Sequence, residues 1–169
     1  SLIIGMCMGA AGVILGISWF TGTSLTAFLE HLKIETLLSS MFISLISLFI
    51  AGYLQIILHE AGHLLFGLAT GYKFISFRIG KLTLIKEKGR FKIKYFKIPG
   101  TAGQCLLLPP DVSPQQLPFI LYNLGGVLMN LFSAIVAILL LTTIPSIFTP
   151  LKLFLLFTAL IGILFALLN

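Results

Sequence analysis

The sequence predicts an all-α polytopic membrane protein with about four transmembrane helices and a small membrane-associated β-hairpin. Of its 169 residues, 58% are hydrophobic and only 9% are charged, and the mean hydropathy is +1.11. Soluble domains carry about 25% charged residues, so a soluble globular protein is excluded as a class. We expect residues 1–169 to form one membrane-embedded domain, with no room for a separate soluble domain.

The apolar residues gather in four runs, which are the expected spans: residues 2–20, 38–71, 117–141 and 151–169. Each run is about as long as the roughly 20 residues that cross a bilayer as a helix. Within lipid, backbone polar groups need internal hydrogen bonds, so each run is expected to be helical.

The basic residues are concentrated in the connection 72–116. Nine of the eleven Lys and Arg residues fall between Lys73 and Lys97. Such clustering marks the cytoplasmic side of a membrane protein, so we expect this connection and the N-terminus to be cytoplasmic. The net charge of +6 then reflects topology. No nucleic-acid partner is expected, because these residues lie next to membrane helices.

Residues 73–98 are expected to form the β-hairpin, at the cytoplasmic face. The stretch "RFKIKY" alternates polar and apolar residues, the period of a strand. "KEKG" (86–89) stands where the turn would be, with Gly89 able to adopt a positive φ. The alternative is a basic loop that binds anionic lipid.

The run 38–71 contains the costly polar residues of "HEAGH" (59–63). His59 and His63 are four positions apart, so they project from one helix face and can share a Zn²⁺ ion. Glu60 can then act as general base on a metal-bound water. The pattern predicts metal-assisted peptide hydrolysis, with one Zn²⁺ per chain.

The alternative for these histidines is a structural role as packed core residues. Ionisable groups at the centre of a bilayer cost about 2.5–3.5 kcal/mol on insertion scales, which favours a functional role. At 1.5 Å per residue, the pair lies about 28–35 Å from Ser40, near the inner face of a hydrocarbon core about 30 Å thick. Water can reach that depth from the cytoplasm.

Three elements resemble the site-2 protease family of intramembrane zinc metalloproteases. "HEAGH" lies in an expected span, "GGVLMN" (125–130) resembles the family's Gly-Pro-x-x-Asn element, and the terminal "LLN" (167–169) resembles the start of its Asn-x-x-Pro…Asp-Gly motif. The hairpin is similar to the β-element that these proteases place after the HExxH helix. The resemblance covers residues 38–169 and implies an integral membrane zinc endopeptidase, expected in the cell membrane.

The chain departs from the family in two places. Val127 stands where the family has proline. The Asp-Gly motif, which supplies the family's third zinc ligand, is absent. The resemblance implies that this ligand follows Asn169 and that the domain is incomplete at its C-terminus. Asp111 is the alternative ligand within the chain, since Glu30 and Glu35 are expected on the outer side.

Asn130 is the candidate substrate-binding residue, because it could hydrogen-bond a scissile carbonyl or bound peptide. The alternative is a helix–helix hydrogen bond, which buried Asn residues in membranes commonly make. The expected substrate is a membrane-spanning protein or peptide, held in extended form by a strand edge within residues 91–98. Membrane lipid and a regulatory membrane partner are also expected.

The second hypothesis is a protein that has the fold of these proteases but no proteolytic activity. A catalytically incomplete, site-2-protease-like protein would hold a partner or a metal without cleaving. The intact Glu60 argues against it. A small transporter would need polar residues along several spans, whereas here they cluster at one depth.

Overall fold

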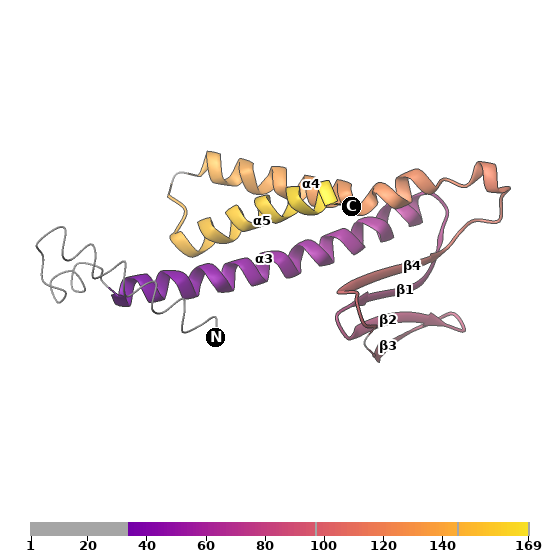
Figure 1. Ribbon diagram of the computed structural model, residues 1–169. Helices are drawn as coiled ribbons and strands as arrows, with labels where there is room; N and C mark the ends of the chain where they lie inside the picture. The colour runs from indigo at the N-terminus through magenta and orange to yellow at the C-terminus, as the bar shows by residue number, and fades with distance from the viewer. Residues whose placement is uncertain (1–33, 97, 145, 169) are drawn as a thin grey trace, which may run out of the picture. The chain divides into compact units, whose positions relative to one another are not determined.

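The computed structural model describes residues 34–96, 98–144 and 146–168 (Figure 1). The expected first span, residues 2–20, lies outside the described residues. The chain divides into two compact units, residues 1–43 and residues 44–169. The second unit contains every interaction that is considered below.

Three helices match the other three expected spans: α3 (Ile34–Ala69), α4 (Phe119–Thr143) and α5 (Thr149–Leu168). All three are long and apolar enough to cross a membrane. Their ends differ from the predicted ends by a few residues, and α4 and α5 pack side by side across a short connection (Figure 1). The prediction of helices long and apolar enough to span a membrane is confirmed for this part of the chain.

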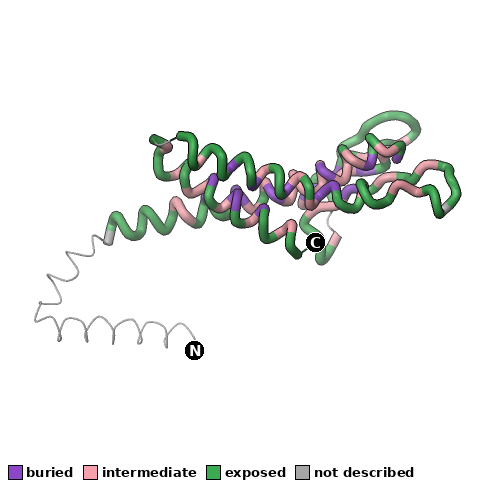
Figure 2. Tube along the Cα trace, turned by 90° about the horizontal axis from the view of Figure 1, so that it is seen from above, coloured by how far each residue is buried: buried purple, intermediate pink, exposed green. Residues whose placement is uncertain are grey.

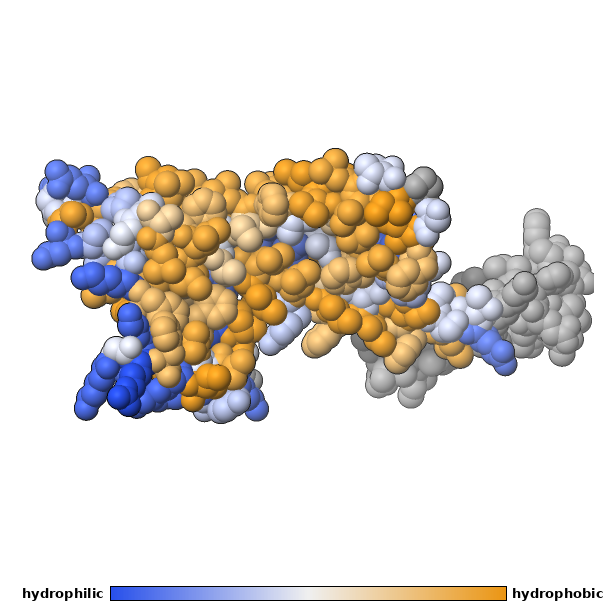
Figure 3. All heavy atoms as spheres, turned by 180° about the vertical axis from the view of Figure 1, so that it is seen from behind, coloured by the Kyte–Doolittle hydropathy of each residue, from blue (hydrophilic) through white to orange (hydrophobic). Residues whose placement is uncertain are grey.

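The helices are apolar outside and comparatively small or polar inside. Large side chains are exposed on them, including Phe49 at 76% and Leu167 at 79%. The buried positions lie where the elements pack together (Figure 2), and include Ala51, Ala134, Ser47, Gln55 and Asn130. Orange apolar atoms cover the helices in Figure 3, and hydrophilic atoms gather at the end that carries the sheet. Small and polar interior residues under an apolar exterior are typical of helices that pack within lipid.

Helices α3 and α4 cross with their backbones in contact at two glycines. A Cβ atom on Gly62 would lie 2.6 Å from the carbonyl carbon of Gly125, and one on Gly125 would lie 2.7 Å from that of Gly62. No residue with a side chain fits at either position without moving a helix. The crossing brings α4 directly against the HEAGH segment of α3.

The connection between α3 and α4 forms a four-stranded antiparallel sheet in the order β3-β2-β1-β4. The strands are β1 (Lys73–Ile79), β2 (Leu82–Glu87), β3 (Arg90–Tyr95) and β4 (Gly103–Leu108). The predicted hairpin is correct for β2 and β3, whose turn residues Lys88 and Gly89 both have positive φ (48° and 78°). The prediction of only a hairpin over residues 73–98 is wrong, because that range also contains β1 and the sheet is completed by β4 beyond it. "GQCLLL" shows no period-two alternation, and its pairing with β1 is non-local.

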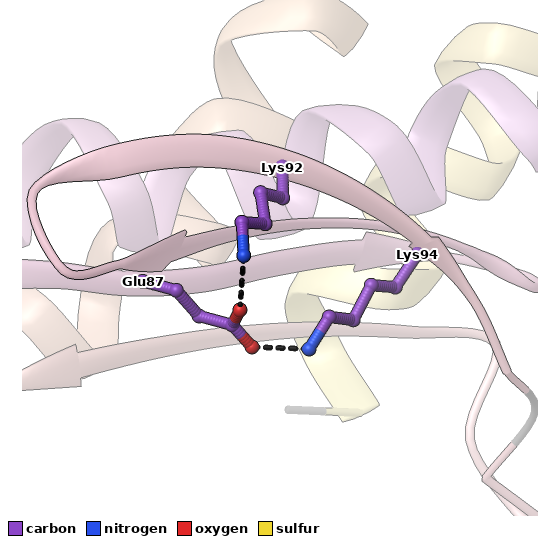
Figure 4. Close-up of polar contacts among 3 residues, drawn as sticks. All are labelled: Glu87, Lys92 and Lys94. Atoms are coloured by element: carbon purple, nitrogen blue, oxygen red, sulfur yellow. Dashed lines mark hydrogen bonds and ion pairs between the residues drawn. The ribbon is translucent and has the colours of Figure 1, made fainter.

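The β2–β3 hairpin is amphipathic. Leu82 pairs with Tyr95 and Leu84 with Ile93, so one face is apolar. On the other face, Lys92 and Lys94 hydrogen-bond the Glu87 carboxylate, with Lys92 Nζ 3.0 Å from Oε2 (Figure 4). These ammonium groups hold the pKa of Glu87 below its ordinary value. Because the cluster is exposed to solvent, it contributes little to stability.

Candidate metal centre

His59 and His63 point their outer ring nitrogens at each other. The Nε2 atoms are 3.1 Å apart, and the two rings meet edge to face at 83°. Two nitrogens bonded at about 2.0–2.1 Å to one tetrahedral zinc ion would be about 3.3 Å apart. The pair therefore has almost the separation that a shared zinc ion requires.

Helix α4 holds both rings from behind. His63 Nδ1 lies 2.7 Å from the Tyr122 carbonyl oxygen, and His59 Nδ1 lies 3.2 Å from Asn130 Nδ2. Metal-binding histidines usually donate the proton of the second ring nitrogen to an acceptor, which orients the ring. The Tyr122 carbonyl is such an acceptor for His63, and this is a second feature that suits His63 to metal binding.

Gly126 makes room for the His59 ring. A Cβ atom at this position would lie 2.6 Å from both Nδ1 and Nε2 of His59. The two glycines of "GGVLMN" thus have separate tasks, since Gly125 allows the helix crossing and Gly126 accommodates the imidazole. Val127, where the family has proline, continues α4 without interruption.

Glu60 faces the sheet, on the side of strand β4. A Cβ atom on Gly103 would lie 2.8 Å from Glu60 Oε1, and the backbone N–H of Cys105 hydrogen-bonds the carboxylate. A cavity of about 280 Å³ opens here, lined by Ile56, His59, Glu60, Ala102, Gly103 and Phe165. One candidate ligand and the candidate base therefore share a cavity that can hold water or part of a peptide.

Cys105 is a buried free cysteine beside this cavity. Burial, together with the nearby Glu60 carboxylate, raises the pKa of its thiol to about 12. Such a thiol stays protonated and unreactive at neutral pH.

Arg78 in β1 belongs to the cluster of basic residues between Lys73 and Lys97. Its side chain is nevertheless buried, with only 1% exposed. Its guanidinium donates to the carbonyl oxygens of Gly80 (2.8 Å), Thr101 (3.3 Å) and Gly103 (3.3 Å), and also to the Thr101 hydroxyl. Arg78 therefore holds the start of β4 in place, including the glycine that contacts Glu60. The feature of the sequence that could have indicated a buried Arg78 is its place at an inward position of an alternating strand.

The other candidate residues lie away from the histidine pair or behind it. Asn130 is fully buried on the far side of His59, and Asp111 is exposed in the bend after β4. No group of three His, Cys, Asp or Glu residues that could hold a metal ion occurs among the described residues. Asn169, after which the third ligand was expected, lies outside them.

The strand beside the site is β4, and not the segment 91–98 that was expected to hold the substrate. Segment 91–98 includes most of β3, at the opposite edge of the sheet. Three strand spacings of about 4.8 Å separate β3 from β4. The strand next to the candidate metal site is therefore β4, which was not predicted, and segment 91–98 lies at the other edge of the sheet.

Comparisons with known proteins add no relative. No protein-family model, no curated protein and no solved structure matches this chain.

We predict that Arg78→Met loosens the start of β4. The substitution keeps an apolar stem but removes the guanidinium hydrogen bonds to the Gly80, Thr101 and Gly103 carbonyl oxygens, at a cost of about 1–3 kcal/mol in unfolding free energy. Limited proteolysis should show faster cleavage within residues 98–103, and the thermal midpoint in detergent should fall. The control is Lys92→Met, which changes an exposed side chain of β3. Equal behaviour of the two variants would contradict the prediction.

Proposed function

We propose that this protein is an intramembrane zinc metalloendopeptidase of the site-2 protease type, which cleaves a transmembrane segment of a membrane-bound protein or peptide precursor. The observation that supports it best is the facing His59–His63 pair, with Glu60 in the adjoining cavity. This arrangement lies in α3, which is apolar enough to cross a membrane. Three ionisable residues in such a helix are expensive unless they have a function.

In this proposal His59 and His63 hold the metal through their Nε2 atoms. Zinc, when bound, would polarise a water molecule and lower its pKa towards about 7. Glu60 accepts the proton of the attacking water and passes it to the leaving amide nitrogen. The Cys105 N–H orients the Glu60 carboxylate towards the cavity.

We place the substrate in the cavity beside Gly103, and not on β3. Peptide bonds within a helix are shielded, so the substrate must unwind before hydrolysis. The peptide groups of Cys105 are already engaged, because its carbonyl accepts a hydrogen bond from the Tyr122 hydroxyl at 3.2 Å. The absence of a side chain at Gly103 leaves the space next to Glu60 open to an extended chain.

The alternative function is a membrane binding protein that has the scaffold but does not cleave. It is favoured by one observation, that the described residues bring no third metal ligand to the histidine pair. A substrate or partner helix would still fit against the exposed apolar surfaces of the helices. Zinc content and proteolysis separate the two functions.

Zinc content is the first test. Purified protein should contain about one zinc ion per chain, since the proposal needs a single catalytic site. His59→Ala and His63→Ala should each lower the zinc content measured by atomic emission, because each removes one ligand. His31→Ala, which changes the third histidine of the chain, should leave it unchanged. Full zinc content in the His59/His63 double variant would reject the site.

Glu60→Gln should separate metal binding from catalysis. The amide has the shape of the carboxylate but cannot take a proton, so we expect normal zinc content and a 10²–10⁴-fold loss of peptide cleavage. The measurement is hydrolysis of a fluorogenic peptide with an apolar segment, in detergent micelles. Glu87→Gln, at an exposed carboxylate, is the control. Undiminished cleavage by Glu60→Gln would rule out its role as base.

We further propose that the protein resides in the cell membrane, with the sheet and the site on the cytoplasmic side. The basic residues of the sheet support this orientation. The test replaces Cys7 with Ser, which leaves Cys105 as the one native cysteine, and introduces Lys88→Cys. Lys88→Cys should react with a membrane-impermeant maleimide only from the cytoplasmic side. The Cys105 thiol should not react with the maleimide, because its pKa of about 12 keeps it protonated. Labelling of Lys88→Cys in intact cells would invert the topology.

A further inference from the structure

A chain of four groups links Asn130, His59, His63 and Tyr122. The contacts are Asn130 Nδ2 to His59 Nδ1 (3.2 Å), His59 Nε2 to His63 Nε2 (3.1 Å) and His63 Nδ1 to the Tyr122 carbonyl oxygen (2.7 Å). Four polar groups in a row, three of them nitrogen-bearing side chains, leave few choices for the positions of their protons.

The Tyr122 carbonyl determines the order of the donors. A carbonyl oxygen only accepts, so His63 carries its proton on Nδ1 and its Nε2 is an acceptor. The contact between the two rings is then a hydrogen bond only if His59 carries its proton on Nε2. His59 Nδ1 becomes an acceptor, and the Asn130 amide group donates to it. Each of the three contacts then has one donor and one acceptor without a metal.

Zinc requires a different arrangement at His59. Both Nε2 atoms must then offer a lone pair, so the His59 proton has to be on Nδ1. The Asn130 NH₂ group, in its observed orientation, would face that N–H with a donor. Within the described residues, Asn130 Oδ1 is buried and has no hydrogen-bond partner. A half-turn of the amide would exchange Nδ2 and Oδ1, and the orphaned oxygen would accept from His59 Nδ1.

We propose that Asn130 is a positioning residue for the metal centre, whose amide turns over when zinc binds. In one orientation it donates to the metal-free His59, and in the other it accepts from the zinc-bound tautomer. The fully buried position of Asn130 keeps water from replacing either hydrogen bond. This inference rests on the proposed zinc site and deepens it, since it makes Asn130 a residue that acts through His59 and not through the substrate.

The test is zinc affinity, which needs no substrate. In Asn130→Leu the side chain neither donates nor accepts, and loss of such a partner typically lowers metal affinity about 10–100-fold. Asn130→Asp can accept from His59 Nδ1, as carboxylates do behind many zinc-bound histidines, and should bind zinc at least as well as the unmodified protein. Asn123→Leu is the matched control, because it makes the same change at an exposed position of α4. Competition with a chelating dye gives the affinities.

A second measurement follows the proton. Nitrogen NMR of the protein labelled with ¹⁵N-histidine should show the His59 proton on Nε2 without metal and on Nδ1 with zinc, while His63 keeps its proton on Nδ1. Three results would each overturn this inference but not the proposed function. They are unchanged zinc affinity in Asn130→Leu, weakened zinc affinity in Asn130→Asp, and a His59 proton already on Nδ1 in the metal-free protein. A protein that binds no zinc at all would overturn the proposed function together with it.

Discussion

The contact between Gly62 and Gly125 is the constraint on which the candidate site depends. The backbones of α3 and α4 touch there, and a single Cβ atom on either residue would separate them. This contact places Gly126 against His59 and brings the Tyr122 carbonyl to His63. Association of helices in lipid relies on close packing and hydrogen bonds, because lipid tails are as apolar as the helix surfaces. The site therefore exists only where the helices approach this closely.

A buried polar cluster fixes the same helices about one turn before His59. Gln55 is fully buried, and its Nε2 donates to the Ser133 hydroxyl (2.9 Å) and to the Thr158 carbonyl oxygen (2.7 Å). Gly162 in α5 leaves the space that this amide occupies. One glutamine thus connects α3 to both α4 and α5. An unpaired amide would be costly in this apolar interior, so the cluster favours a single arrangement of the three helices.

The sheet contributes to the site through one strand. Arg78 holds the Thr101–Gly103 segment, Gly103 lies against the Glu60 carboxylate, and the Cys105 N–H hydrogen-bonds it. The guanidinium satisfies several backbone carbonyls at once, which a lysine cannot do in the same geometry. A residue without any direct contact to the candidate metal site therefore controls how the candidate base is presented.

The sequence by itself determined the features that depend on local geometry and on the surrounding solvent. The three described helices follow from apolar runs that must satisfy their own backbone hydrogen bonds. The common face of His59 and His63 follows from helical periodicity, and the β2–β3 turn follows from Gly89.

Only the tertiary structure decided which groups stand behind the histidines and beside Glu60. Tyr122 and Asn130 are 59 and 71 positions away from their histidine partners, and β4 pairs with a strand that no local pattern connects to it. The local sequence around Arg78 and Cys105 likewise does not determine whether these side chains face lipid, water or the candidate site. Such contacts depend on how closely two helices cross, which no local sequence period encodes.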